Sequence, residues 1–339
     1  MLDRPAMSTA EAATTPTPLV SIGMPVYNGD RYLREALDSL LVQDYPNFEL
    51  VVSDNASQDS TPEICAEYAE RDPRIRYHRV EENKGAIWNF QHVLDLACGG
   101  FFMWAAHDDA RHPSYVSKCL RRLCTNDKAV ACHTCTMLID ESGEAVRLEG
   151  STLTAESDSP RERCRVILAD ASWAYAFYGL MRTSVAKSSN LLRNYYWSDQ
   201  GFVFGLALHG QILQVQEPLF QYRTPREDAA TNATEMREYI ERVVGSLDPA
   251  NGPRRFRMVR LVRGMNHARD IWQAPLPRRA RITILCDLVR YYGWSDGTIY
   301  EIILLLTAAL GPRGTELLTR IVGPTWRVAW RRLHRSNAP

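Results

Sequence analysis

"LVSIGMPVYNGDRYLREALDSLLVQDYPNFELVVSD", residues 19–54, places two strand patterns on either side of one helix pattern. Residues 19–27 form an apolar run that ends at a turn signal, as expected for a strand buried on both faces. Residues 30–43 carry apolar side chains at helical spacing, with Asp30 as the expected N-cap. Residues 48–54 form a second apolar run. This order predicts a parallel strand–helix–strand unit and therefore an α/β fold.

The alternation continues through the first 140 residues. It predicts further strands over 75–80, 99–106 and 129–139, and helices over 61–72, 86–97 and 113–124. Such alternation is typical of a mostly parallel sheet with helices on both faces. Later in the chain, the pattern predicts a helix over 198–210 and one or two strands over 211–223. Residues 1–17 are polar and rich in Thr and Pro, and we expect them to form a loose tail.

Charge is unevenly distributed along the 339 residues, although the formal net charge is zero. From Pro253 onwards there are sixteen Arg, no Lys and five acidic residues. This asymmetry predicts a basic, helical C-terminal region, 251–339, whose partner is anionic. Two alternatives follow: the region rests on an anionic membrane, or it folds back and closes the active site. It has no recognisable nucleic-acid motif, so no nucleic-acid partner is expected.

Several features indicate a cytoplasmic protein, with peripheral contact to the membrane as the possible exception. The N-terminal residues have no apolar segment of the kind found in secretory signals, so we expect the eight Cys to be reduced thiols. The most apolar stretch, 298–310, has thirteen residues, fewer than the roughly 20 that cross a bilayer.

Polar clusters follow each of the first four predicted strands. Ligands of such sheets bind beyond the carboxyl ends of the strands, so these clusters predict one shared crevice. The fourth cluster is a pair of adjacent carboxylates, Asp108 and Asp109, which is costly unless a cation lies close. Hard oxygen ligands suit Mg²⁺ or Mn²⁺. The alternative is that the pair caps the helix predicted over 113–124.

The motifs "PVYNG", "SDNASQDST", "NKG" and "HDD", in this order and spacing, resemble those of the family 2 glycosyltransferases with the GT-A fold. These are inverting enzymes that use nucleotide sugars. The resemblance covers roughly residues 18–225. It implies a GT-A domain over 18–250, with a nucleotide-binding half at 18–125 and an acceptor half at 126–250.

The resemblance also implies which residues bind the nucleotide. The turn after the first strand would lie against the base, and Asp54 would hydrogen-bond it. The full set of implied nucleotide-binding positions is Pro25, Val26, Tyr27, Asn28, Asp54, Asn55, Asn83, Lys84, Gly85 and Asp108. Three positions have a simpler alternative: a core aromatic for Tyr27, an Asx-turn for Asp54 and a solvated side chain for Lys84.

For the metal, the resemblance implies that Asp109 binds a cation bridging the diphosphate, while Asp108 contacts the ribose or a metal-bound water. Many members have a further Asp two residues before the pair. This chain has Ala106 there, which makes metal use less secure.

For catalysis, the resemblance implies Asp199 as the base, with Ser198 as the helix N-cap. The alternative is that Asp199 only favours the helix dipole. Trp197 would lie on the acceptor or diphosphate side. Many members also have a His after the "YR" segment. It is absent here, and we expect Arg223 or Arg226 to stabilise the leaving group instead.

The expected function is transfer of a sugar, with inversion, from a UDP- or dTDP-sugar to a hydroxyl of a saccharide or polyprenyl-linked acceptor. Cell-surface polysaccharide biosynthesis is the expected context. Two alternatives are a nucleotidyltransferase and a protein that binds nucleotide sugars without catalysis. The first usually has a Gly-rich loop with Arg or Lys after strand one, which "PVYNGDRYLREA" lacks.

Overall fold

The computed structural model describes residues 17–149, 155–169, 171–188, 193, 197–224 and 259–293. The tail predicted over 1–17 lies outside this part of the chain except for residue 17. Arg226 and residues 294–339 also lie outside it.

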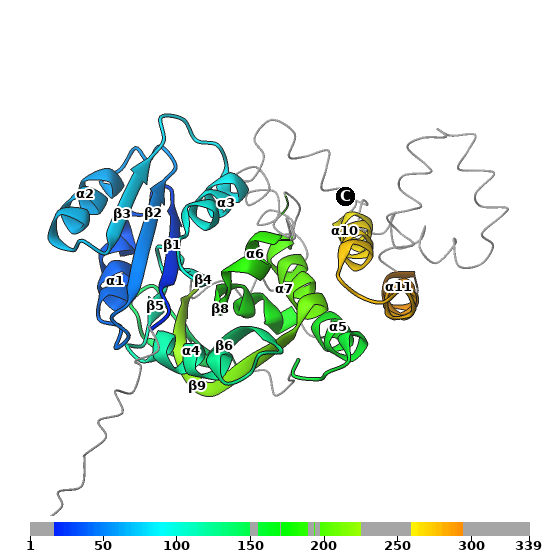
Figure 1. Ribbon diagram of the computed structural model, residues 1–339. Helices are drawn as coiled ribbons and strands as arrows, with labels where there is room; N and C mark the ends of the chain where they lie inside the picture. The colour runs from blue at the N-terminus through cyan, green and yellow to red at the C-terminus, as the bar shows by residue number, and fades with distance from the viewer. Residues whose placement is uncertain are drawn as a thin grey trace, which may run out of the picture.

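The first half of the chain forms a parallel sheet in the order β3-β2-β1-β4. These strands are β1 (Val20–Val26), β2 (Phe48–Asp54), β3 (Ile75–Arg79) and β4 (Phe101–Trp104). Helices α1 (Asp30–Leu41) and α2 (Thr61–Arg71) lie on one side, and α3 (Ala86–Leu96) lies on the other (Figure 1). The predicted α/β fold is confirmed, because apolar strand residues are buried under helices on both faces.

The sheet continues beyond β4 in the order β8-β6-β9-β5, with β7 on the edge of β6. The bounds are β5 (Ala110–Arg111), β6 (Ala129–Ile139), β7 (Ala145–Glu149), β8 (Leu180–Arg182) and β9 (Gln211–Arg223). β8 runs antiparallel to β4 and β6, whereas β6 and β9 are parallel. Residues 211–223 therefore form one strand. This agrees with the first of the two predicted possibilities, one strand or two, and its register opposite β6 is irregular.

The remaining helices flank this second part of the sheet. They are α4 (Tyr115–Cys124), α5 (Pro160–Ala169), the 3₁₀ helix η1 (Ala171–Tyr178), α6 (Thr183–Ser188) and α7 (Ser198–His209). Trp104 connects β4 to this layer, since it is fully buried and stacks on Phe177 at 4.4 Å between ring centroids. Its ring also meets Phe202 of α7 edge-on at 4.9 Å. Truncating such a side chain typically costs about 3–5 kcal/mol, so it fixes η1 and α7 beside the end of β4.

The described part of the C-terminal region, residues 259–293, is helical and packs against the domain. Helices α10 (Val259–Gln273) and α11 (Arg278–Gly293) lie beside α7 and α5 (Figure 1). His267 of α10 is fully buried and stacks on Phe204 of α7 at 4.2 Å. Asp287 of α11 pairs with Arg161 of α5 at 2.6 Å. No helix in the described ranges is both long and apolar enough to cross a membrane.

Two predicted N-caps are wrong. Asp30 is the first residue of α1, which is capped by Gly29, and its carboxylate instead accepts a bond from the Ser60 N–H at 3.4 Å. Ser198 is likewise the first residue of α7, because Trp197 takes the N-cap position with a left-handed backbone, φ 65°. Both helices begin one residue earlier than the capping preference indicated.

Candidate active site

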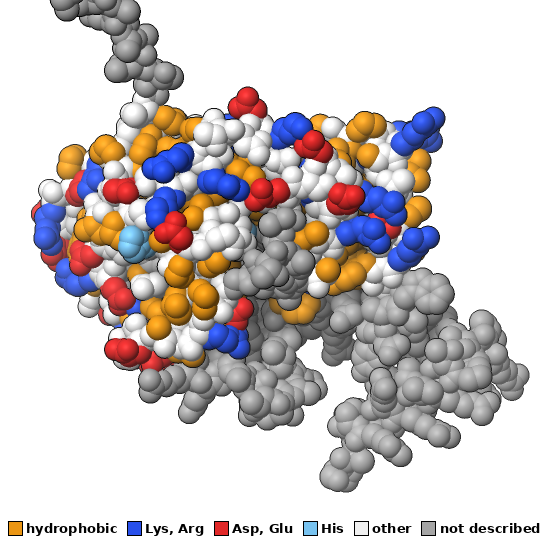
Figure 2. All heavy atoms as spheres, turned by 90° about the horizontal axis from the view of Figure 1, so that it is seen from below, with side chains coloured by type: hydrophobic (Ala, Val, Ile, Leu, Met, Phe, Trp, Pro, Cys, Tyr) orange, Lys and Arg blue, Asp and Glu red, His pale blue; other side chains and the backbone are white. Residues whose placement is uncertain are grey.

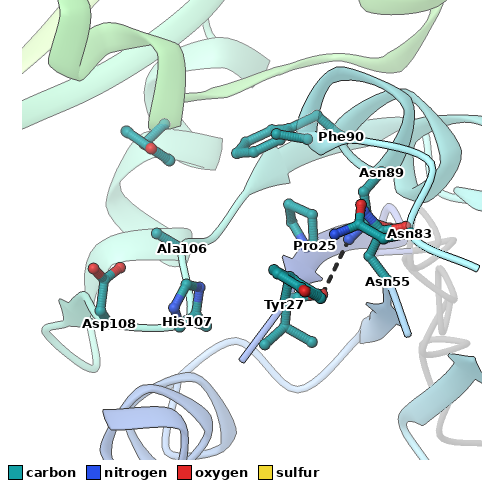
Figure 3. Close-up of a pocket in the computed structure, with 12 residues that line it drawn as sticks. Pro25, Tyr27, Asn55, Asn83, Asn89, Phe90, Ala106, His107 and Asp108 are labelled. Atoms are coloured by element: carbon teal, nitrogen blue, oxygen red, sulfur yellow. Dashed lines mark hydrogen bonds between the residues drawn. The ribbon is translucent and has the colours of Figure 1, made fainter. Parts of the chain in front are cut away.

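A pocket of about 480 Å³ opens at the carboxyl ends of β1, β2 and β4 (Figure 3). Segments that follow the first four strands contribute to its wall, together with α3 and the end of η1. Its lining residues are Pro25, Val26, Tyr27, Asn55, Asn83, Ala86, Asn89, Phe90, Ala106, His107, Asp108 and Tyr178. In Figure 3 three asparagines lie at one end of the pocket, and His107 and Asp108 lie at the other. The pocket thus has an amide end and a carboxylate end.

The turn after β1 forms part of the pocket floor. Tyr27 lines the pocket with 43% of its surface exposed, which excludes the core-aromatic alternative. Asn28 turns away from the pocket: its backbone is left-handed, φ 49°, and its Oδ1 accepts the Gln58 N–H at 2.9 Å. At Gly29, a Cβ would lie 2.3 Å from the His107 ring, so glycine is required for the two turns to meet.

Asp54 and Asn55 have different positions, although they are adjacent. Asp54 is fully buried and does not line the pocket; its carboxylate accepts bonds from the Ser57 N–H at 2.9 Å and the Tyr77 hydroxyl at 3.1 Å. Asn55 lines the pocket and donates to Asn83 Oδ1 at 2.8 Å. Asp54 therefore stabilises the turn after β2 from the buried side, whereas Asn55 is at the pocket surface.

The segment after β3 contributes through Asn83. Its Oδ1 also accepts the Gly85 N–H at 2.8 Å, and Gly85 has φ 87°, a conformation that favours glycine. Lys84 does not line the pocket, because its ammonium lies over the Trp88 ring at 4.5 Å from the centroid. Lys84 is thus packed on an aromatic ring, and its expected contact with a phosphate stays a prediction.

Asn89 of α3 lines the pocket and was missed by the sequence reasoning. Its Nδ2 donates to the carbonyl of Ser53 at 2.9 Å and to that of Val26 at 3.3 Å, which ties α3 to the ends of β1 and β2. Its Oδ1 is buried and has no hydrogen-bond partner among the residues described. A polar residue on the buried face of an otherwise apolar helix pattern was the signal available in the sequence.

The two adjacent carboxylates also occupy different positions. Asp108 lines the pocket, whereas Asp109 is 4% exposed and its Oδ1 accepts the Arg223 N–H at 2.9 Å. Burial and the charge of Asp108 raise the pKa of Asp109 to about 7. Neither residue caps a helix, because β5 intervenes and Ser114 is the N-cap of α4. The helix-cap alternative is therefore wrong.

The donor set at this end of the pocket fits a hard divalent cation in part. Asp109 Oδ2 is buried and lacks a hydrogen-bond partner in the described part of the chain. A buried oxygen of this kind is available to bind a ligand such as a cation. The described residues form no group of three or more His, Cys, Asp or Glu side chains able to hold a metal. A cation here would therefore need further oxygens from a diphosphate and water.

Arg223 holds the Asp pair in place and does not line the pocket. Its Nε donates to the Asp108 carbonyl at 2.9 Å and its Nη1 to the Asp140 carbonyl at 2.9 Å. Its Nη2 lies 2.6 Å from Glu35 Oε1, and its guanidinium stacks on Tyr32. We expected Arg223 to contact the leaving group. In the structure its guanidinium instead binds the Asp108 and Asp140 carbonyls and Glu35. Arg226 falls in a range that the structure leaves undescribed.

Asp199, the expected catalytic base, lies in the first turn of α7. Burial raises the pKa of Asp199, while the Gln200 N–H and the charge of Arg263 act in the opposite direction. Tyr178, a second residue that the sequence reasoning missed, lines the donor pocket. Its pKa is raised well above the usual value, mainly by burial, with contributions from the charges of Asp108, Asp109 and Asp199. Tyr178 is therefore near enough to the carboxylate pair and to Asp199 for their charges to act on it.

The model of the family described as "Glycosyl transferase family 2" matches residues 21–187. The chain belongs to glycosyltransferase family 2. The matched range contains every residue that lines the pocket, so it covers the whole of the donor side. Asp199, β9 and α10 lie beyond the matched range.

Related proteins and structures agree with this family. An uncharacterized glycosyltransferase of Rickettsia typhi is 37% identical over 35% of this chain and 37% of its own length. A putative teichuronic acid biosynthesis glycosyltransferase of Bacillus subtilis, TuaG, is 35% identical over 27% of this chain and 36% of its own. This chain spans only 18% to 37% of the lengths of the curated relatives that are 36–37% identical to it.

Among solved structures, residues 1–349 of Staphylococcus aureus TarS, in complex with UDP-GlcNAc, superpose with a TM-score of 0.61. The superposition covers 85% of this chain and 81% of that one, at 19% sequence identity. At this identity the likeness is one of fold. The GT-A fold of this family 2 member is thereby confirmed beyond the range of the family match.

Proposed function

We propose that the protein is an inverting glycosyltransferase that moves a sugar from a nucleoside diphosphate sugar to an acceptor hydroxyl. The observation that carries the proposal is the two-ended pocket: an amide end suited to a base lies opposite a carboxylate end suited to a metal-bound diphosphate. The charge of Asp199 acts on Tyr178, which lines the pocket, and we assign the acceptor to that side. The proposed order of groups is then base, diphosphate, sugar and acceptor.

The amide end favours a pyrimidine base. Uracil and thymine carry one N–H between two carbonyls, so they need an acceptor flanked by donors. Asn89 Oδ1 supplies a buried acceptor without a protein partner in the described ranges, and Asn55 supplies a neighbouring amide. Tyr27 offers its half-exposed ring as a stacking surface. UDP and dTDP are thus the nucleotides to test first, and the TarS structures with UDP and UDP-GlcNAc support the same choice.

Mg²⁺ or Mn²⁺ would be held by Asp108 and Asp109 together with the diphosphate. When bound, the cation supplies positive charge that stabilises the departing nucleoside diphosphate. Arg223 keeps both carboxylates in position, since its backbone N–H binds Asp109 and its Nε binds the Asp108 carbonyl.

Asp199 acts as the general base. The acceptor hydroxyl attacks the anomeric carbon as its proton passes to the Asp199 carboxylate, and the bond to the diphosphate oxygen breaks on the opposite side. One displacement of this kind inverts the anomeric configuration and needs no covalent intermediate. Burial that raises the pKa of Asp199 makes it a stronger base than an exposed carboxylate.

Donor hydrolysis tests the stereochemistry without knowledge of the acceptor. The protein is incubated with UDP-sugars of α configuration and Mn²⁺, and proton NMR follows the first sugar released. A β anomer at early times supports inversion, and an α anomer contradicts it. UDP binding without either sugar release or transfer would favour the non-catalytic binding protein instead.

We also propose that the acceptor is a saccharide or lipid-linked saccharide of a cell-surface polysaccharide, and that α10 and α11 rest on an anionic membrane. Met265 and Trp272 of α10 lie two turns apart and are 65% and 61% exposed, with the exposed Arg269 between them. On α11, Ile282 and Val289 are 48% and 66% exposed. Apolar and basic side chains on one helix face are typical of interfacial binding.

Figure 2 shows basic and apolar side chains intermixed at the end where α5 and α11 lie. Flotation with vesicles of phosphatidylglycerol, compared with vesicles of phosphatidylcholine, tests the membrane contact. Binding to the anionic vesicles at low salt, weakened in a Trp272→Ser variant, supports it. Equal recovery with both vesicles, or none with either, contradicts it.

A further inference from the structure

Arg263 is a buried cation close to the proposed catalytic base. It lies on α10, is 8% exposed, and places its guanidinium 5.1 Å from the centroid of the Trp197 ring. Its Nε is buried without a hydrogen-bond partner among the described residues. No carboxylate of the described residues lies within salt-bridge distance of it. A buried charge in this state is costly unless a ligand completes it.

The polar residues near Arg263 on α10 are already hydrogen-bonded or paired with other side chains. Asp270 forms an ion pair with Arg193 at 2.5 Å, and Asn266 Oδ1 accepts a bond from Arg193 at 3.3 Å. His267 is fully buried, and burial holds its pKa well below the usual value, so it carries no charge of its own. Arg263 therefore has no salt-bridge partner among the described residues, and the acidic side chain on which its charge acts is Asp199.

Trp197 provides a surface for a sugar at the same place. It precedes α7, is 41% exposed and adopts a left-handed backbone, φ 65°, while Asp199 follows two residues later. Aromatic faces pack against the apolar faces of sugar rings, and a guanidinium binds phosphate or carboxylate oxygens in pairs.

We propose that Arg263 and Trp197 form an acceptor subsite for a sugar that carries an oxyanion, either a phosphate or a carboxylate. The proposal rests on the proposed function, since it places the acceptor on the Asp199 side of the donor pocket. The sugar ring packs on Trp197, its oxyanion binds Arg263, and its hydroxyl reaches Asp199. Because Arg263 belongs to α10, the C-terminal extension is part of the acceptor site.

Fluorine NMR of the full chain labelled with 5-fluorotryptophan tests this subsite. The Trp197 signal is assigned with a Trp197→Phe variant, and the other Trp signals report folding. Three probes are titrated in the presence of UDP and Mg²⁺: glucose, glucuronate and glucose 1-phosphate. The proteins are wild type, Arg263→Gln and, as a matched control, Arg269→Gln, whose side chain is exposed on the same helix.

We expect at least one anionic probe to shift the Trp197 signal with an affinity at least about tenfold above that of glucose. The preference should disappear in Arg263→Gln and persist in Arg269→Gln. Whether glucuronate or glucose 1-phosphate binds identifies the carboxylate or the phosphate. Equal affinity for all three probes in the wild type, or an unchanged preference in Arg263→Gln, overturns the proposal.

UDP binding is measured on the same samples by calorimetry. Absence of UDP binding, with the anion preference intact, would remove the proposed donor function and leave the anion site standing. UDP binding without an anion preference would overturn the anion subsite and leave the proposed donor function standing.

Discussion

The donor side and the acceptor side of this site are built in different ways. The proposed donor pocket is lined mostly by turns that follow successive parallel strands, and each turn carries a short recognisable motif, although the lining residues run from Pro25 to Tyr178. The proposed acceptor side draws on α7 and α10, which begin at residues 198 and 259. Asp199 of α7 and Arg263 of α10 come near each other only because the two helices pack together. The difference teaches that motif order identifies where a donor binds, while acceptor choice depends on contacts between distant helices.

The largest expected effect separates chemistry from donor binding. Asp199→Asn keeps the size of the side chain and removes the proton acceptor, so kcat for transfer should fall by about 10²–10⁴-fold. UDP affinity, measured by calorimetry, should remain within about twofold, because Asp199 lies outside the donor pocket. An undiminished kcat in Asp199→Asn would show that Asp199 is not the catalytic base.

A smaller effect is expected at the contact that holds the carboxylate pair. Arg223→Gln removes the Nε bond to the Asp108 carbonyl and the contact with Glu35, so Mn²⁺-dependent UDP binding should weaken about tenfold. Arg31→Gln is the control, since Arg31 pairs with Glu141 on the exposed surface nearby. Equal affinities of the two variants would show that the Asp pair needs no such support.

The amide end of the pocket can be tested through Asn89. Asn89→Leu leaves the Val26 and Ser53 carbonyls without their donor, which should lower the free energy of unfolding by about 1–3 kcal/mol. Asn89→Asp separates base recognition from this support, because it keeps an acceptor oxygen for the base but replaces the Nδ2 donor with a second oxygen facing the two carbonyls. It should retain the preference for UDP over GDP that Asn89→Leu loses, and a preference that Asn89→Leu also retains would assign the base contact elsewhere.

The smallest expected effect concerns the coupling between the two helices of the acceptor side. The charge of Arg263 lowers the pKa of Asp199, which burial raises. Activity should fall as the pH drops through that pKa, because the base must be ionised. In Arg263→Gln the acidic limb of the kcat profile should therefore move to higher pH. A limb that stays in place, or moves to lower pH, would show that Arg263 does not act on Asp199.

Much of the fold followed from the sequence, because strand–helix alternation and burial on both faces are local signals. The strand over 129–139 and the helix beginning at 198 agree with β6 and α7. The caps at Asp30 and Ser198 failed because long-range partners and a left-handed Trp197, which no local preference reveals, set the helix starts.

The site was less accessible to sequence reasoning. The convergence of the strand-end turns followed from topology alone, yet which side chain of each turn faces the pocket did not. Asp54 and Asn55 are adjacent, and only the tertiary bonds of Asp54 to Ser57 and Tyr77 show which of them is buried. Arg263 could not be singled out among sixteen C-terminal arginines before α10 was placed against α7.

Calorimetric titration of UDP, with and without Mn²⁺, into the wild type and Asp109→Asn tests the central claim most directly. Asp109→Asn keeps the side-chain oxygen that accepts the Arg223 N–H but removes the carboxylate charge beside Asp108. We expect Mn²⁺ to strengthen UDP binding to the wild type by at least about tenfold and to have little effect on the variant. UDP binding that is equal with and without Mn²⁺ in both proteins, or no binding of UDP at all, would contradict a metal-dependent nucleotide-sugar site.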